Sequence, residues 1–134
     1  MRVRTFFVLL PCLLTCGGCA REKSTAQLLE DVKGAEERDR LAAVRLLPQR
    51  KGDAAQTVPA LIEALKAKES DVRWSAAIGL GYYGEEAKDA IPALQAAQRD
   101  RDARIREAAG KALTRIDPAK FPAQTQSKKA TGKS

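Results

Sequence analysis

The side chains that most often perform enzyme chemistry are absent from most of this sequence. It contains no histidine, and its three cysteines, Cys12, Cys16 and Cys19, all lie within the first nineteen residues. Serine and threonine hydroxyls therefore have no imidazole base to activate them, and no disulfide or Cys/His metal cluster can form downstream. The adjacent acids Glu85 and Glu86 are predicted to lie in a solvated link. We therefore expect no catalytic residue, no cofactor and no metal site.

Residues 1–18 have the layout of a secretory signal peptide. A basic start with Arg2 and Arg4 is followed by an apolar stretch of about a dozen residues and by small residues before a cysteine. The apolar stretch is too short to cross a bilayer as a helix, and Pro11 interrupts it. The sequence therefore predicts export of the chain and not a permanent transmembrane helix.

The end of this leader resembles the lipobox of bacterial lipoproteins, in which a cysteine after small residues receives a diacylglycerol. Gly17 and Gly18 precede Cys19, which is the expected attachment site, and Cys16 is the alternative. Each methylene of an acyl chain buried in a bilayer contributes about 0.8 kcal/mol, so two or three chains hold a small domain on a membrane. The resemblance implies a lipid-anchored protein of the cell envelope, on the periplasmic side or the cell surface.

The basic charge of the chain is concentrated at its two ends. The net charge is +7, but residues 19–117 contain 18 basic and 17 acidic residues. A nucleic-acid-binding protein needs a basic face on its folded body, and a nearly neutral body gives little support for one. We therefore expect no nucleic-acid partner. The count leaves open a clustered arrangement of those 18 basic residues.

The body of the chain repeats itself with a period of 33 residues. The tripeptide Pro59-Ala60-Leu61 recurs as Pro92-Ala93-Leu94, and a third copy precedes both without any insertion. The same offset relates apolar residues in all three copies, among them Leu28, Leu61 and Leu94; Ala43, Ala76 and Ala109; and Leu47, Leu80 and Leu113. Fixed periods of this length are typical of stacked structural repeats.

Each copy is predicted to be a helical hairpin. In the middle copy, Leu61 and Leu65 lie on one face of a first helix, for which we expect Thr57 as the N-cap and Pro59 in the first turn. Val72, Ala76, Ala77 and Leu80 lie at helical spacing in a second helix that ends near Gly81 or Gly84. Neither helix can bury its apolar stripe alone, so the hairpins must stack, and the small alanines allow close approach of the backbones.

The proline in the first helix, the Asp71-Val72-Arg73 start of the second and the closing Leu80-Gly81 resemble the pattern of HEAT repeats, and in particular the short HEAT-like repeats of phycobilisome lyases. The resemblance implies an all-α fold, an α-solenoid of about three HEAT-like helical hairpins. The expected organisation is a signal peptide (1–18), a tether (19–25), the repeat domain (26–117) and a disordered basic tail (118–134). In the tail, Phe121 is a candidate to close over the last hairpin.

Arg40, Arg73 and Arg106 share one position of the repeat, and an acid precedes each by four residues. An acid four residues before a base is a favourable pair on a helix, and acids also stabilise a helix N-terminus. We therefore interpret the three arginines as structural, and the resemblance to HEAT-like families implies that they form a ladder between repeats. Binding of an anionic ligand by this row is the alternative.

Three of the six aromatic residues lie in the middle repeat: Trp74, Tyr82 and Tyr83. The fold does not require an aromatic side chain at the positions of Trp74 and Tyr82, because the other two copies have Leu41, Gln49, Glu107 and Arg115 there. Aromatic residues are over-represented among binding anchors, so all three are candidate partner-binding residues. Packing of Trp74 or Tyr83 against a neighbouring helix is the alternative.

These observations together predict a lipid-anchored scaffold or adaptor that binds another protein on the extracytoplasmic side of a bacterial membrane. The alternative is a HEAT-like repeat enzyme, or a subunit that assists one, of the lyase type. The identity of the protein partner cannot be deduced from these residues.

Overall fold

The computed structural model describes residues 22–34 and 36–122, and within these residues the chain forms α-helices and 3-10 helices and no strand. The predicted all-α class is confirmed. The α-helices are α1 (Thr25–Lys33), α2 (Glu37–Leu46), α3 (Ala54–Ala64), α4 (Ser70–Tyr83), α5 (Ile91–Ala97) and α6 (Ala103–Ile116). The 3-10 helices are η1 (Leu47–Gln49), η2 (Lys51–Asp53) and η3 (Gly84–Ala90).

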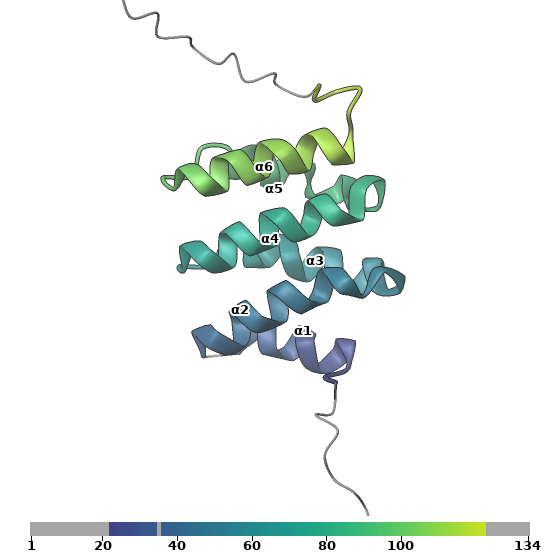
Figure 1. The fold of residues 1–134 in the computed structure, drawn as a ribbon, viewed down its shortest axis with the longest axis vertical. Helices are drawn as coiled ribbons and strands as arrows, with labels where there is room; N and C mark the ends of the chain where they lie inside the picture. Colours follow the sequence, from purple (N-terminus) through teal and green to yellow (C-terminus); the bar gives the residue numbers. More distant parts are fainter. Residues whose placement is uncertain (1–21, 35, 123–134) are drawn as a thin grey trace, which may run out of the picture.

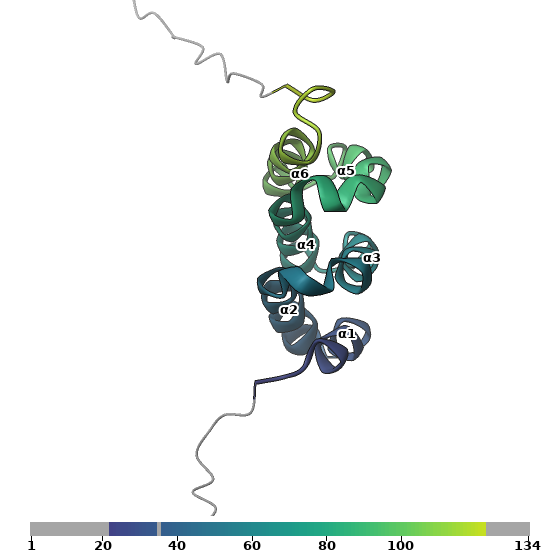
Figure 2. The same cartoon turned by 90° about the vertical axis from the view of Figure 1, so that its right-hand side faces the viewer.

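The helices form three stacked hairpins in two layers (Figures 1 and 2). Helices α1, α3 and α5 make one layer, and α2, α4 and α6 make the other. Each helix of the first layer packs against the next helix in sequence, and α4 packs against both α2 and α6. The predicted α-solenoid is therefore confirmed. We call the surface formed by α2, α4 and α6 the second-layer face.

Local sequence accounts for several helix ends. Ser24 forms a capping box with Gln27 at the start of α1, and the Asp102 carboxylate accepts a hydrogen bond from the Arg104 N–H at the start of α6. Helix α4 ends at Tyr83, and its C-cap is Gly84, whose φ of 55° is readily available only to glycine. Of the two ends predicted for α4, Gly84 is the observed one.

The prediction that Thr57 is the N-cap of its helix is wrong. The 3-10 turn η2 already reverses the chain, so α3 begins at Ala54, and both Thr57 and Pro59 lie inside it. Thr57 is fully buried, and its hydroxyl has no hydrogen-bond partner among the described residues. The expected first-turn proline is found instead in α5, where Pro92 is the second residue of the helix.

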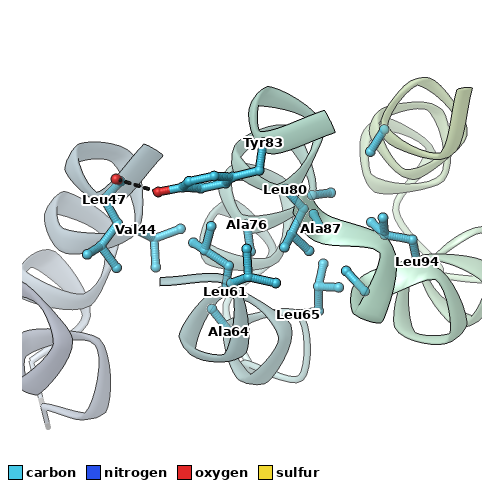
Figure 3. Packing of buried hydrophobic residues seen from close by; sticks show 14 of the residues in the cluster. Val44, Leu47, Leu61, Ala64, Leu65, Ala76, Leu80, Tyr83, Ala87 and Leu94 are labelled. Atoms are coloured by element: carbon cyan, nitrogen blue, oxygen red, sulfur yellow. Dashed lines mark hydrogen bonds between the residues drawn. The ribbon is translucent and has the colours of Figure 1, made fainter. Parts of the chain in front are cut away.

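The core lies between the two layers and runs through all three hairpins (Figure 3). Leu47, Leu80 and Leu113, which share one repeat position, are fully buried. Tyr83 is 6% exposed, and its hydroxyl donates a hydrogen bond to the Leu47 carbonyl oxygen at 3.0 Å. Tyr83 therefore joins the end of α4 to the turn that follows α2.

Two glycines of α4 lie in close contact with neighbouring elements. A Cβ at Gly81 would lie 3.2 Å from the Ala112 Cα, and one at Gly79 would lie 2.8 Å from the Pro48 Cγ. Both distances are shorter than ordinary contacts between carbon atoms. Ala43, Ala76 and Ala109 are buried in the same stack, and two glycines of the middle helix also leave no room for a side chain.

The predicted leader and lipid site lie outside the described residues, since Cys16 and Cys19 precede residue 22. None of the helices within the described part is long and apolar enough to cross a membrane.

At the C-terminal end of the described residues, Phe121 packs against the core, and its N–H donates to the Asp117 carbonyl oxygen. The beginning of the predicted tail therefore folds back on α6.

Candidate functional site

An aromatic ridge runs along α4 on the second-layer face. Trp74, Ile78 and Tyr82 are four residues apart, so they form one line on the helix surface. Trp74 and Ile78 are half-buried, whereas Tyr82 is 59% exposed. We call these three residues the α4 ridge.

A groove with mainly apolar walls lies between α2 and α4, with a volume of about 460 Å³. We call it the apolar groove. The α4 ridge forms one wall, and Val44 and Pro48 belong to the opposite wall. The remaining lining residues are Arg45, Gln49, Ser75 and Gly79.

A second groove, of about 410 Å³, lies on the other side of the ridge, between α4 and α6. We call it the charged groove. Small residues line it next to the ridge, namely Ala77, Gly81, Ala108 and Ala112. Its charged lining residues all come from α6, and they are Arg104, Glu107, Lys111 and Arg115.

The charges of these grooves are partly paired. Lys111 Nζ lies 2.6 Å from Glu107 Oε1, and this hydrogen bond lowers the pKa of Glu107. Arg104 Nη2 lies 3.2 Å from Asp71 Oδ1 and 2.9 Å from Asp102 Oδ2. These pairs are solvent-exposed and contribute little to stability, so a binding partner could replace them at small cost.

Arg45 and Arg115 differ from the other basic residues of the grooves. No carboxylate of the described residues lies within ion-pairing distance of either guanidinium. Arg115 instead lies over the Tyr82 ring, with its central carbon 5.7 Å from the ring centroid. This contact places a positive charge directly beside the exposed end of the α4 ridge.

Of the three candidate partner-binding residues, the structure brings Trp74 and Tyr82 together on one surface and separates Tyr83 from them. The side chain of Tyr83 is in the core, with its hydroxyl bonded to main-chain oxygens. The alternative interpretation, packing against a neighbouring helix, describes Tyr83. We therefore leave it out of the candidate surface.

Two of the three arginines of the repeat position join successive hairpins. Arg40 Nη2 lies 2.6 Å from Glu69 Oε1 in the second hairpin, and Arg73 Nε lies 2.8 Å from Asp100 Oδ2 in the third. Arg106, in the last hairpin, donates to the main-chain oxygens of Asp100 and Arg101. These contacts lie in and beside the links between the helices of each hairpin.

The expected acid–arginine pairs within a helix are replaced by other pairs. Glu69, four residues before Arg73, binds Arg40 of the preceding hairpin, and Asp102, four residues before Arg106, binds Arg104. Both acids are N-cap residues with extended backbone, so they lie before the first turn of the helix. Their side chains are therefore not on the helix surface where residues four apart can pair.

Arg73 is the most buried arginine of this set, with its side chain 9% exposed. Asp100 accepts two of its hydrogen bonds, and the Ala67 and Lys68 carbonyl oxygens accept two more. The hydrogen bond from Arg73 lowers the pKa of Asp100. Since the Arg73 donors are already directed to protein oxygens, we see a structural contact here and not an open anion site.

The sequence did not single out the basic side chains that line the grooves. The 33-residue period could have identified them. Arg45 and Lys111 occupy the repeat position of Ile78, and Arg115 occupies that of Tyr82. Writing the second helices of the three copies in register therefore places these side chains beside the α4 ridge.

Comparison with known protein families gives a match. The model of a family described as HEAT repeats matches residues 25–114, which include all six α-helices except the last two residues of α6. No curated protein matches the chain.

Proposed function

Because the chain belongs to the HEAT-repeat family, we propose that it is a scaffold or adaptor and that it binds another protein through the second-layer face. HEAT repeats commonly mediate protein–protein interaction. The observation that supports this particular face is the α4 ridge, a line of large side chains with a groove on each side. Partly exposed aromatic residues beside pockets are frequent anchors of protein interfaces.

We further propose that the protein is exported and held on a bacterial membrane by lipid on Cys19, with Cys16 as the alternative site. The support is the leader sequence, with its basic start, short apolar stretch and Gly17-Gly18-Cys19 end. Such an anchor would leave the repeat domain free to bind its partner at the envelope, on the extracytoplasmic side.

Site-specific photo-cross-linking in the producing cell tests the binding surface. A benzoylphenylalanine at position 82 is expected to give a discrete protein adduct, and the Trp74→Ala change should weaken that adduct. The matched control is the same photo-reactive residue at position 95, because Gln95 is exposed on α5 in the other layer. Equal adducts from both positions, or an adduct from position 95 alone, would argue against the second-layer face.

The intact mass of the membrane-extracted protein tests the anchor. We expect a mature chain that begins at Cys19 and carries acyl groups, and we expect Cys19→Ser to abolish the acyl mass while Cys16→Ser retains it. The opposite result would assign the lipid to Cys16. A mature chain without any acyl mass would refute the anchor and leave the proposed binding surface unaffected.

A further inference from the structure

The two grooves beside the α4 ridge differ in chemistry, and this difference restricts the partner. The apolar groove has Val44, Pro48, Trp74 and Ile78 among its walls. The charged groove has four charged side chains on its α6 side, together with two alanines. A ligand that fills both grooves must therefore combine apolar and charged side chains.

The charges that line the two grooves are predominantly basic. Arg45, Arg104, Lys111 and Arg115 line the grooves together with one acid, Glu107, which is bound to Lys111. Arg104 is paired with Asp71 and Asp102, so Arg45 and Arg115 are the two bases of the grooves without a carboxylate partner among the described residues. This basic cluster is local, because the described residues contain nearly equal numbers of acids and bases. Charge complementarity across an interface therefore favours a negatively charged partner.

We propose that the partner is an acidic protein segment that also carries large apolar side chains. This inference rests on the proposed function and specifies the partner class of the same face. The apolar side chains of the segment occupy the apolar groove and pack on Trp74 and Ile78. Its carboxylates lie over the charged groove, where Arg115 and Lys111 bind them.

A membrane surface fits this face less well than a protein segment does. Basic and aromatic residues also bind anionic lipid, but insertion requires apolar side chains that protrude. Here only Tyr82 protrudes from the ridge, while Trp74 and Ile78 are half-buried between the two grooves. The two grooves beside the α4 ridge have the shape to receive side chains of a protein segment.

The first layer of a second copy, formed by α1, α3 and α5, does not offer the required surface within its described residues. The exposed large apolar side chains there are Leu46 and Tyr82, and neither belongs to the layer of α1, α3 and α5. In that layer, Glu63 forms an ion pair with Lys66. The proposed ligand must carry both large exposed apolar side chains and unpaired acids. The first layer does not combine the two, so it does not fit as the ligand.

Selection from a random 12-residue peptide library on the full chain tests the proposal. We expect the enriched peptides to carry net negative charge together with Leu, Ile, Phe or Trp. The charge-reversed variant Arg45→Glu with Arg115→Glu should lose this acidic bias. The matched control, Lys88→Glu with Arg99→Glu, makes the same change in net charge outside both grooves and should retain the bias.

Affinities of the best enriched peptide provide the quantitative test. We expect Trp74→Ala and Arg115→Glu each to weaken binding about tenfold or more, and we expect added salt to weaken binding to the wild type. The Lys88→Glu, Arg99→Glu control should change the affinity less than twofold. Circular dichroism melts of all variants separate a loss of binding from a loss of folding.

Three results would overturn the proposal. The first is enrichment of peptides with no acidic bias, or with the same bias in the charge-reversed variant. The second is Trp74-dependent binding to vesicles containing phosphatidylglycerol in place of peptide binding. The third is a concentration-dependent dimer that Trp74→Ala abolishes. A protein adduct from position 82 alongside any of these results would leave the second-layer face as a binding surface and refute only the acidic partner.

Discussion

Two glycines in the same layer of the solenoid, Gly81 and Gly110, provide a sharp test of the tight stacking of α4 on α6. Gly81 and Gly110 are both helical and, with φ outside the positive range, both tolerate a side chain in their backbone conformation. They differ in their surroundings. A Cβ at Gly81 would lie 3.2 Å from the Ala112 Cα and 3.3 Å from its Cβ, whereas the nearest atom to a Cβ at Gly110 is the Gln98 Nε2 at 3.6 Å.

The expected free energies follow from these distances. Replacing a helical glycine by alanine stabilises a helix by about 0.8 to 1 kcal/mol when there is room. Gly110→Ala should therefore raise the free energy of unfolding by up to about 1 kcal/mol. At Gly81 the new methyl group meets main-chain atoms that cannot rotate away, and overpacking of this kind costs about 1 to 3 kcal/mol. The net effect of Gly81→Ala is a loss of up to about 2 kcal/mol.

Thermal melts followed by circular dichroism measure the difference. For a domain of this size 1 kcal/mol corresponds to about 4 to 8 °C, so the Tm of Gly110→Ala should exceed that of Gly81→Ala by at least about 4 °C. If Gly81→Ala raised the Tm as much as Gly110→Ala does, α4 and α6 could not be in the close contact described, and the explanation for the small residues of α4 would be wrong.

Three further changes test the core and the contacts between hairpins. Leu80→Ala, in the middle hairpin, should cost about 2 to 5 kcal/mol and shift a circular dichroism melt more than Leu47→Ala does, whereas an unchanged melt would contradict the stacked core. Asp100→Asn should cost about 2 to 4 kcal/mol at neutral pH in urea titrations, because it leaves Arg73 without its counter-charge. Since the pKa of Asp100 is lowered in the fold, its contribution is present above its ordinary value of 3.8 and is lost as the pH falls below it. The wild type should therefore lose more stability than Asp100→Asn below about pH 4, and equal losses would refute this pairing. Ser75→Ala should raise the Tm, because it removes a buried hydroxyl without a partner among the described residues, and a lower Tm would show that the hydroxyl is satisfied.

The sequence allowed prediction of the fold because the repeat is internal. Three copies without insertions identified both helices of each hairpin, and helix α4 ends directly before Gly84, one of the two glycines expected. The N-terminus of α3 was not predictable in the same way. A side chain such as Thr57 can cap a helix or lie inside it, and the choice depended on whether the preceding Lys51–Asp53 segment turned the chain first.

The candidate surface was predictable only in part. Tyr82 and Tyr83 are adjacent in sequence, and on a helix adjacent residues point about 100° apart, so at most one of them can share the line of Trp74. The spacing of four from Ile78 already favoured Tyr82. The partners of the arginines could not be read from the sequence, because Arg40 and Arg73 reach into the next hairpin, and the period gives repeat positions but no distances between them.

The small residues of α4 affect both stability and the proposed binding site. Gly81 contacts α6 directly, and the same residue lines the charged groove beside Tyr82. A larger side chain at this position would push α4 away from α6 and also fill the groove next to the ridge. Close packing of the middle helix thus leaves Tyr82 exposed beside the small residues of the charged groove, with the Arg115 guanidinium of the next hairpin 5.7 Å from the centroid of its ring. The stacking contact between α4 and α6 and the binding surface therefore depend on the same residue, so a variant of Gly81 should be judged by its melting temperature before any change in binding is assigned to the surface.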